Sequence, residues 1–101
     1  MEGRNFEFHD GEKGAAIAVH IKRKKGTSCF QRVQKDGSVV VQMETGGGDL
    51  NEKLIKFLAS ELNIPRKKFQ IIAGEDGSKK LISILDTKPK QVQKRILELI
   101  S

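Results

Sequence analysis

Residues 49–85 read DLNEKLIKFLASELNIPRKKFQIIAGEDGSKKLISIL, and they predict a helix followed by two strands. Asp49 is of a type that caps helix N-termini, and apolar residues then recur three and four positions apart, as on one face of a helix. Asn63 readily takes the left-handed conformation that ends a helix, and Pro65 prevents its continuation. We therefore predict a helix over residues 49–62, then strands in FQIIAG (69–74) and KKLISIL (79–85).

The segments on either side complete the pattern. Upstream, AAIAVHI (15–21) and SVVVQM (38–43) alternate or cluster apolar residues as strands do, and CFQRVQ (29–34) is a shorter strand candidate. Asp36-Gly37 between the last two suggests a type I′ hairpin turn, which needs two residues with positive φ. Downstream, DTKP places Pro89 in the first turn of a second helix over residues 88–100.

This order of elements predicts an α+β fold in two layers. We expect a small mixed β-sheet of about four core strands, in the order β-β-α-β-β-α, with both helices on one face. Residues 1–14 are polar and turn-rich, and we interpret them as an N-terminal arm. Residues 15–101 form a single domain, since a chain of 101 residues has room for one modest core.

Composition limits the setting of the protein. A single cysteine, Cys29, allows no internal disulfide and favours a reducing compartment, so we expect a cytoplasmic protein. No apolar run approaches the roughly 20 residues of a membrane span. We expect a monomer with no membrane partner and no cofactor.

The charge is positive and unevenly spread. The formal net charge is +6; residues 1–14 hold two bases and four acids, a sum of −2, which leaves +8 for the rest. Such a domain attracts polyanions, and clustered bases are typical of proteins that bind nucleic-acid phosphates. The candidate nucleic-acid or anion-binding residues are Lys22, Arg23, Lys24, Lys25, Arg66, Lys67, Lys68, Lys79 and Lys80.

Two glycine-containing loops resemble phosphate loops at first sight. In AGEDGSKK (73–80) a strand follows, not the helix of a Walker motif, so we interpret the segment as a turn in which Gly77 takes positive φ. In GGGD (46–49), Asp49 already supplies negative charge to the helix N-terminus, so we interpret the glycines as a linker before a cap.

Few residues suit catalysis or metal binding. His9, His20 and Cys29 have no metal-ligand spacing, and we predict no metal site. His20 and Cys29 could meet across neighbouring strands as base and nucleophile, although a semi-buried structural thiol is the commoner arrangement. We therefore expect that the protein is not an enzyme.

Three segments, AIAVHIKRK, LNEKLIKFLASELNIPRKKFQIIAGE and GSKKLISI, resemble the YggU-like family of small proteins of unknown function. The family's helix pattern Asn-x-x-Leu-(Ile/Val)-x-Phe-Leu is matched by Asn51, Leu54, Ile55, Phe57 and Leu58. Its later Gly-Glu, turn and basic residue are matched by Gly74, Glu75, Gly77 and Lys80. The resemblance implies a two-layer fold with four core strands and two helices.

The sequence leaves the function open. The leading hypothesis is a non-enzymatic module that binds RNA or DNA through its backbone with little sequence specificity, because no aromatic residues interleave with the basic runs. One alternative is an adaptor that docks an unidentified protein through a sheet edge or an exposed apolar patch. A third is a small enzyme acting on a phosphorylated compound.

Overall fold

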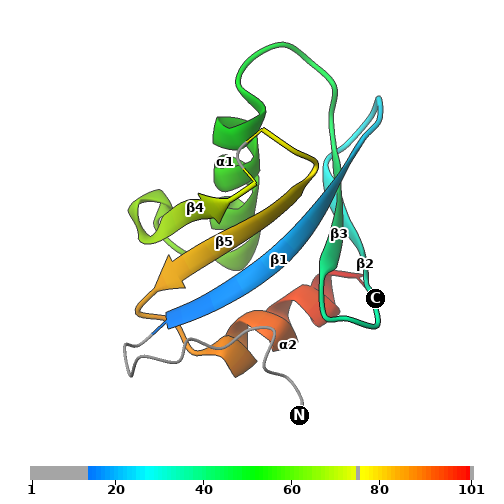
Figure 1. Ribbon diagram of the computed structural model, residues 1–101. Coiled ribbons are helices and arrows are strands. Elements are labelled where there is room, and N and C mark those ends of the chain that lie inside the picture. Colours follow the sequence, from blue (N-terminus) through cyan, green and yellow to red (C-terminus); the bar gives the residue numbers. More distant parts are fainter. Residues whose placement is uncertain (1–13, 75, 101) are drawn as a thin grey trace.

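The computed structural model describes residues 14–74 and 76–100, and within them the strands form one five-stranded sheet (Figure 1). The strands are β1 (Gly14–Arg23), β2 (Cys29–Val33), β3 (Val39–Met43), β4 (Phe69–Ala73) and β5 (Lys79–Leu85). They lie in the order β2-β3-β1-β5-β4, with β1 and β3 parallel and the other neighbours antiparallel. The predicted α+β class with a mixed sheet is confirmed.

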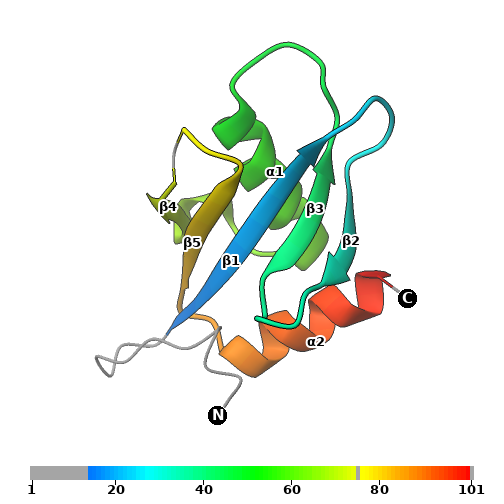
Figure 2. The same cartoon turned by 45° about the vertical axis from the view of Figure 1, so that its right-hand side comes forward.

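Both helices pack on the same face of this sheet. Helix α1 (Leu50–Leu62) lies behind the strands and α2 (Pro89–Ile100) runs along the lower end of the sheet toward β2 (Figure 2). Leu58 of α1 and Ile96 of α2 are fully buried in one cluster with alternate strand residues such as Ile17, Val39 and Ile82. The predicted two-layer arrangement is therefore confirmed. Among residues 14–74 and 76–100, no helix covers the other face of the sheet, which we call the open face.

The ends of α1 form as the sequence predicts. The Asp49 carboxylate accepts a hydrogen bond of 2.9 Å from the Asn51 amide, which satisfies one of the unpaired donors of the first turn. Asn63 takes the left-handed conformation at φ 58° and ψ 47°. Pro65 follows, and the short 3-10 helix η2 (Arg66–Lys68) leads into β4.

The sheet has one strand more than the four that the sequence predicts. The additional edge strand is β2, whose one neighbour among the described strands is β3. A bulge between Phe30 and Arg32 interrupts its alternation, because Phe30 pairs with Val41 and Arg32 with the very next residue, Val40. Phe30 packs β2 against the helical layer, since the centroid of its ring lies 5.1 Å from the centroid of the Phe57 ring on α1.

The turn between β2 and β3 differs from the predicted type I′ turn. Gly37 has φ 91°, but Asp36 does not have positive φ. The Gly37 amide donates to the Gln34 carbonyl at 2.9 Å, and the Gln34 amide donates to the Ser38 carbonyl at 2.7 Å. These bonds define a three-residue turn that ends in a left-handed glycine. Asp36 stabilises the turn through its side chain, which accepts a hydrogen bond from the Ser38 amide.

In the loop before β5, the glycine with positive φ is also not the predicted one. Gly74, not Gly77, has positive φ, at 78°. The Gly77 amide donates to the Gly74 carbonyl at 3.1 Å, so the segment does reverse the chain as expected. Gly74 permits this close return, because a side chain there would overlap the carbonyl of Lys79.

The predicted arm, residues 1–14, lies outside the described residues apart from Gly14, the first residue of β1. Of the helices that are described, none combines the length and the apolar character that crossing a membrane requires.

Candidate nucleic-acid interface

Strand pairing brings basic side chains together on the open face. The register places His20 of β1 opposite Lys79 of β5 on one side and Val40 of β3 on the other. Val40 in turn pairs with Arg32 of β2. Paired residues project to the same face, and this face is opposite the one that buries Val19 in the helical layer. Lys79, His20 and Arg32 therefore lie in one row across the open face.

Lys22 and the following loop extend this row toward one end of the sheet. Lys22 lies two residues beyond His20 on β1, so it projects from the same face. Lys24 and Lys25 follow in the exposed loop to β2. All of these lysines, together with Lys79 and Arg32, are exposed. We call this set, Lys22, Lys24, Lys25, Arg32 and Lys79, the basic face.

Arg32 is the member that sequence reasoning missed. Strict alternation after the buried Phe30 would turn Arg32 toward the helices, where no charge is tolerated without a partner. The bulge shifts the register by one residue, so the Arg32 side chain projects from the open face instead. A charged residue two positions from a buried aromatic was the only signal in the sequence for such a shift.

A pocket of about 290 Å³ lies beside His20 and Lys79 of this row, and residues of the β2–β3 turn also line it. Its polar lining residues are His20, Gln34, Asp36, Ser38, Lys79 and Lys80. The Asp36 carboxylate accepts from the Ser38 amide at 2.9 Å and contacts the Ser38 hydroxyl at 2.6 Å. The pocket thus joins the Lys79 ammonium and the His20 ring to one carboxylate that the turn holds in place.

Asp36 stays ionised at this position. Hydrogen bonds from the side chain and the backbone of Ser38 lower the pKa of Asp36 below its ordinary value, and the nearby charge of Lys79 acts in the same direction. The carboxylate is therefore an anion within an otherwise cationic surface at neutral pH.

Two residues of the predicted set do not join the basic face, because strand alternation turns them the other way. Lys80 pairs with Val19 on the helix side; it is only 4% exposed, and its ammonium donates to the Gly74 carbonyl at 3.1 Å. Arg23 pairs with Met43, a core residue, so its exposed side chain leaves the sheet on the helix side. The same alternation that buries Ile82 could have indicated the direction of Lys80.

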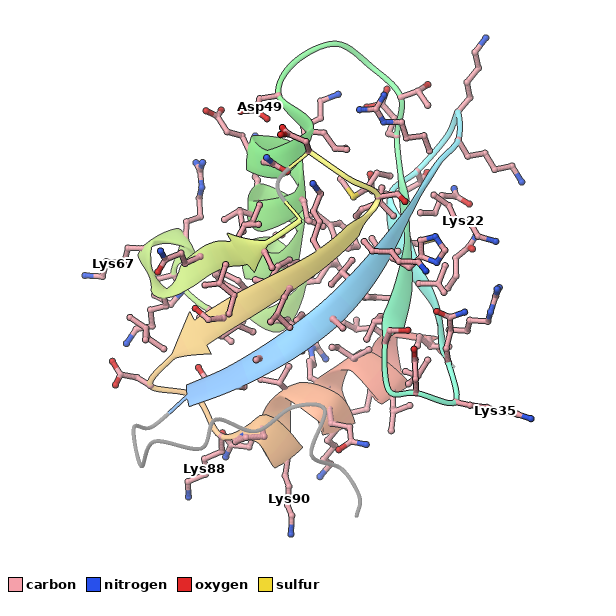
Figure 3. All side chains as sticks on the ribbon, in the orientation of Figure 1. Lys22, Lys35, Asp49, Lys67, Lys88 and Lys90 are labelled. Atoms are coloured by element: carbon pink, nitrogen blue, oxygen red, sulfur yellow. The ribbon has the colours of Figure 1, made fainter. Side chains whose placement is uncertain are left out.

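The second basic run lies elsewhere. Arg66, Lys67 and Lys68 form η2 beside the edge strand β4, and Lys68 pairs with Asp86 at 2.9 Å. Figure 3 shows Lys22 and Lys67 on opposite sides of the molecule. The two runs therefore do not make one continuous surface, and a single short ligand cannot contact both.

The glycine-rich loop before α1 is already bound to the protein's own side chains. The Glu44 carboxylate accepts from the Gly46 amide at 2.9 Å, and the Lys53 ammonium donates to the Gly46 carbonyl at 2.7 Å. The N-cap Asp49 accepts from the Asn51 amide of the first turn, so one carboxylate lies at the helix N-terminus and a second, Glu44, lies at the loop. This geometry agrees with the interpretation of the loop as a linker and cap.

Catalytic and metal-binding arrangements are not apparent in residues 14–74 and 76–100. Strand β3 separates His20 on β1 from Cys29 on β2, so the two side chains are about 10 Å or more apart at the usual strand spacing. No group of three His, Cys, Asp or Glu side chains among these residues could hold a metal ion.

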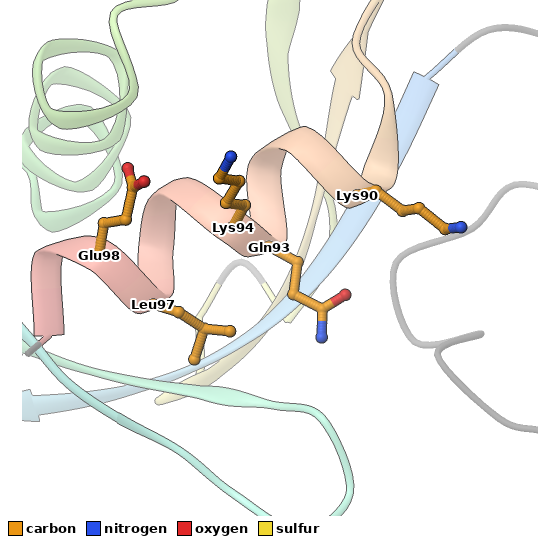
Figure 4. Close-up of a pocket in the computed structure, with 5 residues that line it drawn as sticks. All are labelled: Lys90, Gln93, Lys94, Leu97 and Glu98. Atoms are coloured by element: carbon orange, nitrogen blue, oxygen red, sulfur yellow. The ribbon is translucent and has the colours of Figure 1, made fainter.

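A larger concavity, about 470 Å³, lies along α2 and has the lining Lys90, Gln93, Lys94, Leu97 and Glu98. Figure 4 shows these side chains spreading in different directions from a single helix. Because a binding site needs polar groups that converge on one point, we do not assign a site here.

A comparison of the chain with models of known protein families gave no match. The resemblance to the YggU-like family stays a prediction that rests on the segments quoted above. The candidate interface therefore rests on the geometry of this chain alone.

Proposed function

We propose that this protein is a non-enzymatic module that binds the phosphate backbone of nucleic acid through its basic face. The proposal rests on one observation, the register that brings Lys79 and Arg32 level with His20 on the face without helices. Sequence distance hides this convergence, because the three residues belong to three different strands.

The spacing of the basic face suits a chain of phosphates. Neighbouring strands are about 4.8 Å apart, so Lys79 and Arg32 are separated by about 14 Å across the sheet. Lys22, Lys24 and Lys25 continue the charge toward the β1–β2 loop. Long cationic side chains that neutralise phosphates release counterions, which is the main source of affinity in backbone-directed binding.

The aromatic residues favour binding with little sequence specificity. Base recognition in single strands usually needs aromatic side chains on which bases stack. The phenylalanines of the described residues are Phe30, Phe57 and Phe69, and all three pack with the helix-side core. The basic face therefore offers phosphate contacts without a stacking platform.

The test compares two variants that lose the same charge at different places. The basic-face variant replaces Lys22, Arg32 and Lys79 with Gln, and the η2 variant replaces Arg66, Lys67 and Lys68 with Gln. Fluorescence anisotropy with a labelled single-stranded RNA and a duplex DNA measures affinity at low salt. We expect the basic-face variant to bind both at least about tenfold more weakly and the η2 variant to bind within about twofold of the wild type.

Because both variants remove three charges, attraction to net charge alone predicts equal losses. Equal losses would therefore contradict the proposed interface. No binding by the wild type at tens of micromolar protein would contradict the function itself. Thermal melting of both variants checks that the substitutions leave the fold intact, including the loss of the Lys68–Asp86 ion pair.

A second candidate function is docking of a protein at the edge strand β4. Beside this edge lies a concavity of about 410 Å³ with Ile55, Phe69 and Ile71 among its lining residues. Ile72 on β4 is 46% exposed, and an uncovered edge strand can pair with a strand of another chain. Affinity capture with the wild type, and with Ile72→Glu as control, would recover such a partner only with the wild type.

We also propose that the chain is a monomeric, cytoplasmic member of the YggU-like family. The single cysteine supports a reducing compartment, and the quoted segments support the family. Sedimentation equilibrium of the purified chain tests the monomer, and a dimer that persists at micromolar concentration would contradict it.

A further inference from the structure

Asp36 is an anomaly in a surface that binds phosphates. Its carboxylate lies in the pocket with His20 and Lys79, on the turn beside the row of basic side chains. A carboxylate only accepts hydrogen bonds, and it repels phosphate oxygens at close range. A backbone-binding surface therefore loses affinity by holding Asp36 there, unless the ligand brings a hydrogen-bond donor to the same point.

DNA and RNA differ in whether their backbone brings such a donor. The phosphodiester and the deoxyribose of an internal DNA nucleotide offer acceptors only. The ribose of RNA adds a 2′-hydroxyl, which donates as well as accepts and is the group by which proteins distinguish the two nucleic acids. An ionised carboxylate beside a phosphate site is thus matched to RNA and mismatched to DNA.

The pocket is built to hold this carboxylate in place. Both contacts from Ser38, the amide at 2.9 Å and the hydroxyl at 2.6 Å, are to Oδ1 of Asp36. A carboxylate has about four acceptor positions, so two contacts leave capacity for a ligand. The Ser38 hydroxyl also lies 2.8 Å from the side-chain oxygen of Gln34, which fixes the turn further.

The size of the pocket also fits one nucleotide unit. Its volume of about 290 Å³ is just below the roughly 300–1,000 Å³ of small-ligand pockets. That volume suits one sugar with its phosphate and not a whole duplex. The Lys79 ammonium, the His20 ring with its N–H donor, and the Asp36 acceptor line the same space, as a ribose phosphate requires.

We propose that the basic face selects RNA over DNA, because Asp36 accepts a hydrogen bond from a ribose 2′-hydroxyl while Lys79 and His20 hold the adjacent phosphate. This inference rests on the proposed function and names its ligand class. A charged hydrogen bond of this kind is expected to give about tenfold preference, which corresponds to about 1.4 kcal/mol.

The experiment uses three labelled single strands of one sequence, made with ribose, with deoxyribose and with 2′-O-methyl ribose. The 2′-O-methyl strand keeps an RNA-like sugar but has no hydroxyl to donate. Fluorescence anisotropy at low salt should give the wild type about tenfold higher affinity for RNA than for either of the other two strands.

Asp36→Asn is the matching variant, because its amide oxygen can still accept from Ser38 while the charge is lost. It should bind all three strands within about twofold of one another and bind DNA more tightly than the wild type does. Glu98→Gln on α2 is the control: it removes one negative charge away from the pocket, so it should keep the preference for RNA.

The possible outcomes test the preference for RNA separately from backbone binding itself. Binding of all three strands with equal affinity by the wild type would overturn the RNA preference and leave backbone binding standing. A preference for RNA that the 2′-O-methyl strand shares would overturn the role of the hydroxyl, since sugar shape alone would explain it. No binding of any strand would overturn both proposals.

Discussion

Gly74→Ala tests whether the loop before β5 depends on a single glycine. Gly74 has φ 78°, a conformation that costs an ordinary L-residue about 1–2 kcal/mol. A methyl group there would also overlap the Lys79 carbonyl oxygen and lie 3.1 Å from its carbonyl carbon. Forcing an extra carbon into a packed site costs typically about 1–3 kcal/mol more. We therefore expect Gly74→Ala to lower the free energy of unfolding by about 2–5 kcal/mol.

Gly77→Ala is the matched control in the same loop. Gly77 does not have positive φ, and the nearest atoms to an added methyl group would be 3.9 Å away. Its replacement should leave stability within about 0.5 kcal/mol, as at ordinary surface sites. Urea unfolding followed by circular dichroism measures both variants. A loss below about 1 kcal/mol for Gly74→Ala, or an equal loss for Gly77→Ala, would refute the assignment of the strained position.

Three further predictions concern single side chains. Phe57→Ala should lower the free energy of unfolding in urea by about 2–3 kcal/mol. This is less than the roughly 3–5 kcal/mol of a fully buried ring, because Phe57 is only partly buried against Phe30. A loss below about 1 kcal/mol would contradict this packing. Asp49→Ala should cost about 1 kcal/mol by removing the cap of α1, and no change in the melting temperature would contradict the cap. Because the folded state lowers the pKa of Asp36 below its ordinary 3.8, the contribution of this group is complete above about pH 5 and is lost as the pH falls through the folded value. Wild-type stability should therefore fall relative to Asp36→Asn between pH 5 and 3, and parallel pH profiles would contradict that shift.

Local features of the fold were predictable from the sequence, because each depends on neighbouring residues. The cap at Asp49, the left-handed Asn63 and the helical spacing between them define α1 without reference to the rest of the chain. The α+β class and the placement of both helices on one face follow from the order of the apolar patterns. Strand β2 was harder to predict, because the bulge at Phe30 and Arg32 breaks the alternation of apolar and polar residues that identifies strands.

The candidate site depends on contacts between distant parts of the chain, and these could not be read from the sequence. The row of Lys79, His20 and Arg32 exists only because β3 and β5 flank β1 in one particular register. The basic runs that the sequence made conspicuous turned out to lie on opposite sides of the molecule. The opposite directions of Lys79 and Lys80 were predictable in principle, since alternation with Ile82 turns Lys80 toward the core.

The dependence of affinity on salt tests the proposed interface most directly. If all five cations of the basic face contact phosphates, log K should fall with log salt at a slope of about −3.5 for a single strand and about −4.5 for duplex DNA. Replacing Lys22, Arg32 and Lys79 with Gln should make these slopes shallower by about 2 to 3, while replacing Arg66, Lys67 and Lys68 should change them by less than about 1. Slopes that flatten equally in the two variants, or that flatten only when η2 is changed, would contradict the assignment of the nucleic-acid interface to the open face.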